Sequence, residues 1–239
     1  MFPRSTLIFA FCLTTLISSA QSVDSVFARY VDYLGGGSRL RAIHSRIDSG
    51  TYNYGGLEFP FISYAQSPDH YKYVVTFKGK YFAQAFDGLQ GWKIDVFKNE
   101  KQKNLLKGNN AKAMANEAEV NLEPPFMDYK QKHHTAAFAG TDTVDGRLCD
   151  CVNFKFADNS TALYCFDKQT GALLEKIALS KNPELNNAIL QTFYSEYTEI
   201  GGIKFPFKTI HKIKDQTVLT ITLKGIALNP PIDENIFKP

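Results

Sequence analysis

The sequence lacks the residue patterns that most enzyme classes need. It contains no nucleophile elbow, no phosphate-binding loop and no dinucleotide-binding fingerprint. Its glycine triplet, Gly35 to Gly37, follows a helical pattern instead of a strand, so it predicts a helix end. We therefore expect no catalytic residues and no cofactor, and a hydrolase is the weakest of the functions considered below.

Histidine and cysteine are also few, and neither forms a metal-binding pattern. Of the five histidines only His133 and His134 are neighbours, and consecutive strand residues point to opposite faces of a sheet. No histidine stands next to a cysteine, so we expect no zinc site. Asp87 and Asp167 open turns, in which an aspartate bonds to backbone amides two residues on, and we assign both a structural role.

An excess of charge of one sign is missing as well. There are 27 Lys and Arg residues against 24 Asp and Glu residues, and the formal net charge is only +3. Lysine pairs such as Lys101 and Lys103 stand among polar residues without forming a sustained basic stripe. Nucleic acid is therefore not expected as a partner.

Long hydrophobic runs are absent except at the N-terminus. Arg4 precedes an apolar run from Leu7 to Ile17, which is followed by the small residues Ser18-Ser19-Ala20. This pattern predicts a signal peptide over residues 1–20 with cleavage near Ala20, and the run is shorter than the ~20 residues of a membrane span. The remainder, residues 21–239, has a length that all-β chains fill as one domain, so we predict a single exported domain.

Three cysteines remain after this cleavage, and an oxidising compartment allows one intramolecular disulfide among them. Cys149 and Cys151 share one face of the same predicted strand, which makes a bond between them unfavourable. Cys165, on the next strand, is the better partner for either, and Cys151–Cys165 is our candidate disulfide. A one-residue change of hairpin register would turn Cys165 away and leave three packed thiols.

Helical periodicity follows the leader in two short segments. Apolar residues from Val23 to Leu34 recur at helical spacing after the N-cap residue Ser22, and a shorter helical segment begins at Ser38. Both segments are amphipathic and need an apolar surface to cover.

A polar insertion, residues 99–132, interrupts the strands. Its alanine-rich stretch after Asn110 predicts one helix, and Pro124-Pro125 would open a second. We predict this insertion to be a mobile lid. Its apolar members include Met114, Phe126 and Met127.

Period-two alternation fills the two remaining parts of the chain. From Arg46 to Phe97 it predicts five strands, and from His134 to Leu228 six or seven, with short turns rich in Gly, Asn and Asp. Short turns join antiparallel neighbours. No linker separates the two runs, so we predict one large, strongly curved antiparallel sheet of about 11 strands with helices on one side.

Several segments of the chain occur in the order found in a known family. They are Tyr33-Leu34-Gly35-Gly36, Asp87-Gly88 with Gly91-Trp92, Asp167-Lys168-Gln169-Thr170-Gly171, Gly201-Gly202-Ile203-Lys204-Phe205-Pro206, and Asn229-Pro230-Pro231 with Phe237 and Pro239. Through them the chain resembles the outer-membrane lipoprotein-sorting protein family of Gram-negative bacteria, in the LolA/LolB-like superfamily, over residues 23–239. The resemblance implies a periplasmic half-open β-barrel whose concave apolar face is covered by helices and receives acyl chains. The family's helix-latching arginine is matched here only by position, at Arg46.

Aromatic residues supply the candidate ligand contacts. The chain has 19 Phe and 12 Tyr residues, many at alternating strand positions. Transfer of a long acyl chain from water to an apolar surface contributes a binding free energy on the order of 10 kcal/mol, before the entropic cost of ordering the chain is subtracted. A carrier can therefore hold such a chain without a covalent bond. The predicted inward-facing set is Tyr73, Val75, Phe77, Phe82, Trp92, Ile94, Phe193 and Phe205.

Two non-enzymatic functions follow from these patterns and from the resemblance. The first is a periplasmic carrier of lipid or acylated protein, with lipoprotein sorting to the outer membrane as its specific form and a membrane-bound donor or acceptor as its partner. The second is a cell-envelope interaction module whose concave face packs its own side chains and whose partner is another protein. An empty apolar groove would favour the first function, and a filled core would favour the second.

Overall fold

The computed structural model describes residues 22–180 and 188–239, and the predicted signal peptide, residues 1–20, lies outside them. Strands occur in two runs, as the alternation predicts. The first run holds β1 (Ser45–Tyr54), β2 (Leu57–Gln66), β3 (His70–Phe77), β4 (Lys80–Asp87), β5 (Gly91–Asp95) and β6 (Asn104–Leu105). The second run holds β7 (Thr135–Val144), β8 (Arg147–Lys155), β9 (Thr161–Asp167), β10 (Leu173–Leu179), β11 (Ile189–Ile200), β12 (Ile203–Ile213) and β13 (Gln216–Leu228).

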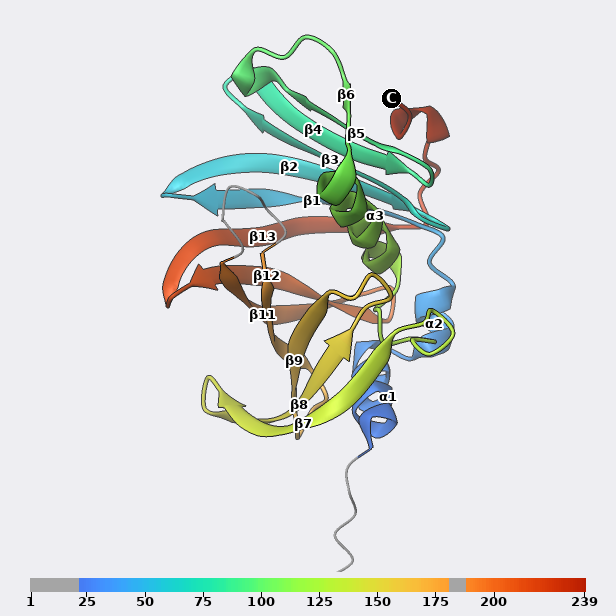
Figure 1. Cartoon of the computed structure of the whole chain (residues 1–239), viewed down its shortest axis with the longest axis vertical. Coiled ribbons are helices and arrows are strands. Elements are labelled where there is room, and N and C mark those ends of the chain that lie inside the picture. The colour runs from blue at the N-terminus through green and yellow to red at the C-terminus, as the bar shows by residue number, and fades with distance from the viewer. Residues whose placement is uncertain (1–21, 181–187) are drawn as a thin grey trace, which may run out of the picture.

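These strands form one antiparallel sheet of 13 strands, in the order β6-β5-β4-β3-β2-β1-β13-β12-β11-β10-β9-β8-β7. Within each run, neighbours in the chain are neighbours in the sheet, because short turns join them. The two runs meet where β1 pairs with β13. In the described chain β6 and β7 are the sheet's two edges, so the sheet is open (Figure 1). The predicted mainly β class with one large antiparallel sheet is confirmed, with two more strands than expected.

Three α-helices accompany the sheet in the described residues: α1 (Val23–Leu34), α2 (Gly37–Arg41) and α3 (Gly108–Leu122). The hydroxyl of Ser22 caps α1 by accepting a hydrogen bond from the Ser25 amide at 3.2 Å. Gly35 ends α1 with a φ of 123°, and a Cβ there would lie 2.2 Å from the Gly202 carbonyl oxygen. Only glycine therefore lets the end of α1 pack against the turn between β11 and β12.

The prediction of a second helix in the insertion is wrong. Residues 125–133 form consecutive turns, in which the Met127 amide donates to the Pro124 carbonyl and the Gln131 amide to the Asp128 carbonyl. Asp128 adopts a left-handed φ of 52°, which interrupts the helical path one turn after it begins.

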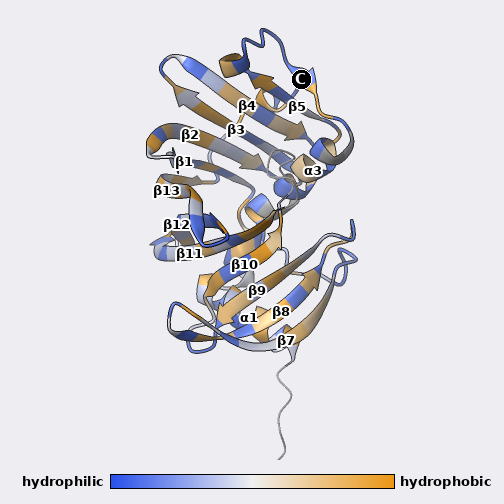
Figure 2. Ribbon diagram, turned by 60° about the vertical axis from the view of Figure 1, so that its left-hand side comes forward, coloured by the Kyte–Doolittle hydropathy of each residue, from blue (hydrophilic) through white to orange (hydrophobic). Residues whose placement is uncertain are grey.

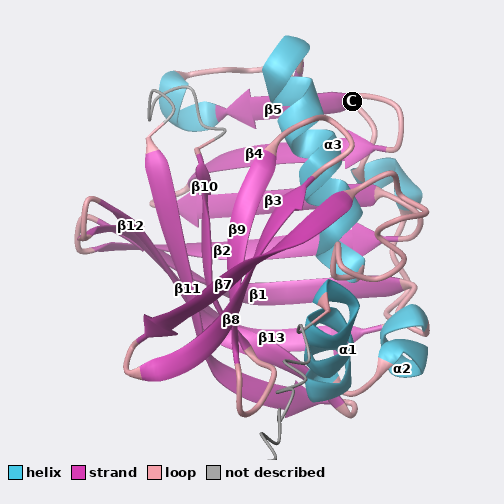
Figure 3. Ribbon diagram, turned by 60° about the horizontal axis from the view of Figure 1, so that its bottom comes forward, coloured by secondary structure: helices cyan, strands magenta, loops and turns pink. Residues whose placement is uncertain are grey.

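The sheet curves around α1. This helix contacts both β12 and β7, which lie five places apart in the strand order, so it must sit inside the curve. α3 packs across β2, β3, β4 and β5 on the same side of the sheet (Figure 3). We call this side the concave face and the opposite side the convex face. As predicted, helices cover the concave side.

Side-chain alternation divides the core between the two faces. On the concave face, Val152 and Phe154 of β8 pack with α1, whereas Cys149 and Cys151 of the same strand belong to a separate cluster on the convex face. Apolar and polar residues alternate along many strands in the same way (Figure 2). Among the described helices, none combines the length and hydropathy that a membrane crossing requires.

Candidate functional site

The concave face carries a group of aromatic side chains on β1 to β4, of which Tyr73 packs against the α3 cluster. The Tyr52 and Phe61 rings stack with centroids 4.3 Å apart, and the Phe59 and Phe77 rings lie 4.8 Å apart. The backbone register joins these pairs to the next strands, since Phe61 pairs with Val75. We call this group the aromatic patch; its members are Tyr52, Phe59, Phe61, Tyr73, Val75, Phe77 and Phe82.

The aromatic patch is incompletely covered. Phe61 is buried, but the other members keep part of their surface in contact with solvent. Burial raises the pKa of Tyr52 and Tyr73, with nearby Glu117 of α3 adding to the effect, so both phenols stay neutral. The patch is thus an uncharged, largely apolar surface, and it lies on the face that helices cover.

Five of the eight predicted contact residues lie on the concave face. Tyr73, Val75 and Phe77 follow one another at two-residue steps on β3, and Phe82 of β4 pairs with Val75. Phe205 lies farther along the same face, in the cluster that packs with α1. It is separate from the aromatic patch, and the Arg46 guanidinium carbon stands 5.4 Å from its ring centroid.

The other three predicted contact residues were assigned to the wrong face. Trp92 and Ile94 of β5 pair with Ala85 and Ala83, which alternate with the concave residues of β4 and point to the convex face. Phe193 packs beside the convex cysteine cluster. Their strands were predicted correctly, but the face depends on cross-strand register, and a one-residue difference reverses it.

The predicted lid residues fall into two separate clusters. Met114 of α3 is 2 % exposed and packs on Tyr71 and Phe86. Phe126 and Met127 lie instead under α1, where the Phe126 ring stacks on Phe27 with centroids 4.6 Å apart. Of the predicted lid, the part that lies near the aromatic patch is therefore α3.

Polar contacts hold α3 to both halves of the sheet. Arg46 of β1 donates through Nη2 to Asn121 Oδ1 at 3.3 Å, and its Nε lies 3.0 Å from Asp48 Oδ1. Asn116 donates through Nδ2 to Asp158 Oδ2, in the turn between β8 and β9, at 2.6 Å. When α3 moves away, water can replace the partners of these hydrogen bonds, so their net contribution is small. They position α3 without adding much to the free energy needed to displace it.

A polar row crosses the same face beside the aromatic patch. Tyr164, Lys176, Thr192 and His211 pair in this order across β9, β10, β11 and β12. The Thr192 hydroxyl and His211 Nδ1 are 3.1 Å apart. Burial, with Lys176 nearby, lowers the pKa of His211 to about 4, so this imidazole is neutral at pH 7. Sequence reasoning missed this row because its members are far apart in the chain and unremarkable one by one.

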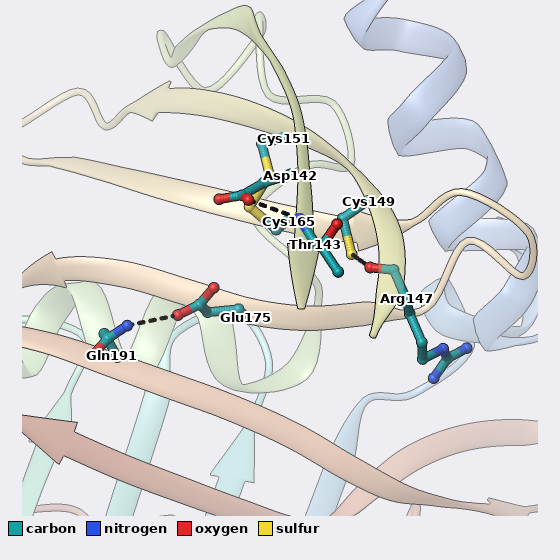
Figure 4. Close-up of a disulfide and its surroundings, with 8 residues drawn as sticks. All are labelled: Asp142, Thr143, Arg147, Cys149, Cys151, Cys165, Glu175 and Gln191. Carbon is teal, nitrogen blue, oxygen red and sulfur yellow. Dashed lines mark hydrogen bonds between the residues drawn. A yellow bond between two sulfur atoms is a disulfide. The ribbon is translucent and has the colours of Figure 1, made fainter. Parts of the chain in front are cut away.

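The three cysteines in the described part of the chain lie on the convex face, away from the aromatic patch. Cys151 and Cys165 pair directly across β8 and β9 and form a disulfide, with their Cα atoms 4.1 Å apart. Cys149 is a free thiol beside them (Figure 4). Burial raises its pKa to about 11, which keeps the thiol protonated and unreactive.

Metal-binding and turn residues were the other groups considered in the sequence. No set of three or more candidate ligands comes together in the described residues. His134 is buried and accepts the Ala157 amide at Nδ1, 3.1 Å away, which is a structural contact. Asp87 and Asp167 accept backbone amides of their own turns, at 2.8 Å from Gln90 and 2.7 Å from Gln169.

Three solved structures share this architecture. A DUF1329 family protein from Desulfovibrio piger is 14 % identical and has a TM-score of 0.60, over 90 % of this chain and 97 % of its own. A LolA superfamily protein from Nitrosomonas europaea is 11 % identical, with a TM-score of 0.58 over 92 % and 99 % of the two chains. An outer membrane lipoprotein-sorting protein domain from Vibrio parahaemolyticus is 10 % identical, with a TM-score of 0.57 over 81 % and 89 %.

These similarities concern the fold. No family model and no curated protein matches the sequence. At such low identities the structural matches establish only that the chain has the LolA-type fold, which is the fold that the resemblance of its turn segments implied.

Proposed function

We propose that this protein is a periplasmic carrier that holds the acyl chain of a lipid or an acylated protein against the aromatic patch. The observation that carries the proposal is the patch itself: its aromatic side chains lie on the helix-covered face, yet all but Phe61 remain partly exposed. Partly exposed aromatic side chains that are contiguous on one face mark a candidate binding surface.

The free energy available is sufficient for reversible carriage. Each methylene removed from water contributes ~0.8 kcal/mol, so a chain that contacts several of these rings can be held without covalent attachment. The polar row at Lys176, Thr192 and His211 offers hydrogen-bonding groups for the polar end of the same molecule. Acyl chain and polar end would then lie side by side on one face.

Release requires the cover to move, and α3 is suited to do so. Its contacts with the sheet combine a small apolar cluster around Met114 with the exchangeable bonds of Asn116 and Asn121. Displacing α3 would leave the buried members of the α1 cluster in place, because Phe126 and Met127 belong to that cluster and only Leu122 of α3 packs against it. We assign α3 as the lid and residues 125–133 to the permanent core.

Lipoprotein sorting to the outer membrane is the specific form of this proposal. The outer membrane lipoprotein-sorting domain from Vibrio parahaemolyticus supports it through shared fold. In this form the cargo is an acylated protein, and a membrane-bound donor or acceptor completes the transfer. The alternative form carries free phospholipid and needs no acylated partner.

The test is native mass spectrometry of the mature protein purified from the periplasm, with lipid extraction and identification on the same sample. We expect a stoichiometric adduct that bears an acyl chain. Uptake of added acylated peptide but not phospholipid would support sorting, and the reverse would support lipid carriage. A clean unliganded mass that takes up neither compound contradicts the carrier proposal and favours the interaction module.

Two neighbouring valines provide matched variants. Val75 belongs to the aromatic patch, whereas Val74 packs on the convex face beside Trp92 and Ile94. Val75→Asn should abolish the adduct, because it places an amide under the acyl chain. Val74→Asn makes the same chemical change one residue away and should retain it. Equal loss in both variants, with unchanged thermal unfolding, would place the cargo elsewhere.

A further inference from the structure

A second surface feature lies on the convex face, away from the aromatic patch. Side chains of β3, β4 and β5, with Lys103 just before β6, line a hollow of about 390 Å³. These strands lie at the end of the molecule where the C-terminus is found (Figure 1). Its lining residues are Lys72, Val74, Thr76, Tyr81, Ala83, Trp92, Ile94 and Lys103. We call it the convex hollow.

Two lysines flank the indole of Trp92 in this hollow. The Nζ atoms of Lys103 and Lys72 stand 4.1 and 5.7 Å from the ring centroid. Lys103 also donates to the Lys238 carbonyl oxygen at 2.6 Å, and Trp92 Nε1 donates to the Phe237 carbonyl oxygen at 2.6 Å. These bonds fix the tryptophan and one ammonium group in place.

No carboxylate of the described residues forms an ion pair with Lys72 or Lys103. Burial and the proximity of Lys103 lower the pKa of Lys72, as expected for a cation that lacks a counter-charge. The hollow therefore suits an anionic group from outside.

The surrounding segment is also basic. Residues 70–107, which include β3 to β6, contain eight lysines against three acidic residues, although the whole chain has a net charge of only +3. The excess of five positive charges in this segment exceeds that of the entire molecule, so the rest of the chain is slightly negative. Positive potential is concentrated at one end of the sheet.

Apolar side chains accompany this charge. Val74, Ala83 and Ile94 form the floor of the hollow, Tyr81 at its rim is 39 % exposed, and Leu105 opposite Trp92 is 53 % exposed. A small inorganic anion would gain nothing from such a floor. Trp92 itself is 2 % exposed and lies beneath the lysines. Lysines combined with an exposed tyrosine and an exposed leucine match the chemistry of a bilayer interface, where anionic head groups lie above acyl chains.

We propose that the convex hollow docks the protein on an anionic lipid bilayer, with a lipid phosphate between Lys72 and Lys103 and the start of its acyl region against the apolar floor. The site is distinct from the aromatic patch and does not depend on which cargo, if any, the concave face holds. Docking through it leaves the concave face unobstructed.

Trp92 is the only tryptophan of the chain, so its fluorescence reports directly on this site. The experiment mixes the mature protein with vesicles of phosphatidylcholine alone or of phosphatidylcholine with brominated phosphatidylglycerol, and follows flotation and Trp92 quenching. We expect flotation and quenching with the anionic vesicles only, both weakened at high salt. Equal binding to neutral vesicles, or binding without quenching, overturns the proposal.

Two pairs of lysines provide the variant and its control. Lys72→Gln with Lys103→Gln should weaken vesicle binding by about thirtyfold, since each lysine near an anionic surface strengthens binding about fivefold. Lys155→Gln with Lys224→Gln removes the same charge from exposed positions on β8 and β13 and should change affinity little. Equal weakening in both double variants would indicate net charge instead of a site and would overturn the proposal.

A further variant and a further probe separate the remaining outcomes. Leu105→Glu changes an exposed residue, so it should fold, and it should reduce flotation. Inorganic phosphate should leave Trp92 fluorescence unchanged at concentrations where vesicles bind. A response to phosphate without vesicle flotation would identify a free-anion site and overturn membrane docking. Adduct formation at the concave face, read by mass spectrometry, tests the carrier proposal independently.

Discussion

The two halves of the concave face differ in how completely their aromatic residues are buried. In the half that packs with α1, Phe154 and Phe166 are 1 % and 0 % exposed, and the Phe126 ring contacts both edge-on. In the half against which α3 packs, the Phe77 and Phe82 rings remain partly exposed. Arg29 of α1 also pairs with the fully buried Asp150, whereas the polar contacts of α3 are hydrogen bonds of half-buried asparagines.

This difference indicates that the two halves of one sheet have different roles. A close-packed aromatic cluster loses several kcal/mol when a ring is removed, so the α1 half behaves as a fixed core. The α3 half keeps apolar surface that a ligand can still bury. The same residue types therefore stabilise the fold at one end and provide a binding surface at the other.

Deleting one ring from each half is the strongest test of this comparison. Phe166→Ala should lower the free energy of unfolding by about 4 kcal/mol, because it leaves a cavity in a closed core. Phe82→Ala should lower it by only about 1 kcal/mol, since its ring is already partly exposed, while reducing acyl-chain binding. Urea denaturation gives both values. Equal losses in the two variants would contradict the distinction between core and binding surface.

Removing the disulfide should have the next largest effect. Cys151 and Cys165 are separated by 14 residues, and opening a loop of this size lowers the free energy of unfolding by about 3 kcal/mol. The double variant Cys151→Ala with Cys165→Ala should therefore unfold at lower urea concentration yet bind cargo normally once folded. Cys149→Ala serves as the control for loss of a buried sulfur in the same cluster.

Acid should destabilise the protein through the polar row. The pKa of His211 is lowered by burial to about 4 in the folded state, against the ordinary value of 6.5 for histidine. The unfolded chain binds this proton first, so stability is lost as pH falls from about 6.5 to about 4 and is unaffected above that range. We expect a loss of about 3 kcal/mol, measured by urea denaturation at pH 7 and pH 4. His211→Gln should remove this component, and an unchanged pH profile would contradict it.

Loosening α3 should have the smallest effect. Asn121→Ala removes the bond from Arg46, which is worth about 1 kcal/mol, or roughly a fivefold change in opening equilibrium. Hydrogen exchange should quicken in the amides of α3 but not in those of α1. Similar acceleration in both helices would show that they open together, against the proposed lid.

The sequence predicted which segments form strands and helices better than it predicted which face of the sheet each side chain occupies. Alternation and turn residues are local signals, so the strands from Arg46 to Phe97 and the helix after Asn110 follow from neighbours in the chain. The orientation of Trp92 depends instead on which residues of β4 it pairs with. Phe193 faces the convex side for the same kind of reason, because it pairs with Glu175 beyond a register shift in β10.

Other features could not be found by reading along the chain. The left-handed Asp128 ends a helical turn that Pro124-Pro125 correctly begins, and no residue type makes that outcome certain. The lysines of the convex hollow are separated by β4 and β5, so no basic stripe marks them in the sequence. The polar row likewise exists only after four strands have paired.

The pairing of β1 with β13 has a consequence for how the chain reaches this structure. The strands on either side of that junction, β1 to β6 and β7 to β13, are each built from consecutive hairpins that can form early and locally. The pairing of β1 with β13 joins the first strand to the last and closes a loop that contains every other strand. It therefore has the largest entropic cost of loop closure in the sheet. We expect the middle of the finished sheet to be the last part to form, with the Arg46–Asn121 contact and its neighbours assembling only after the whole chain has emerged.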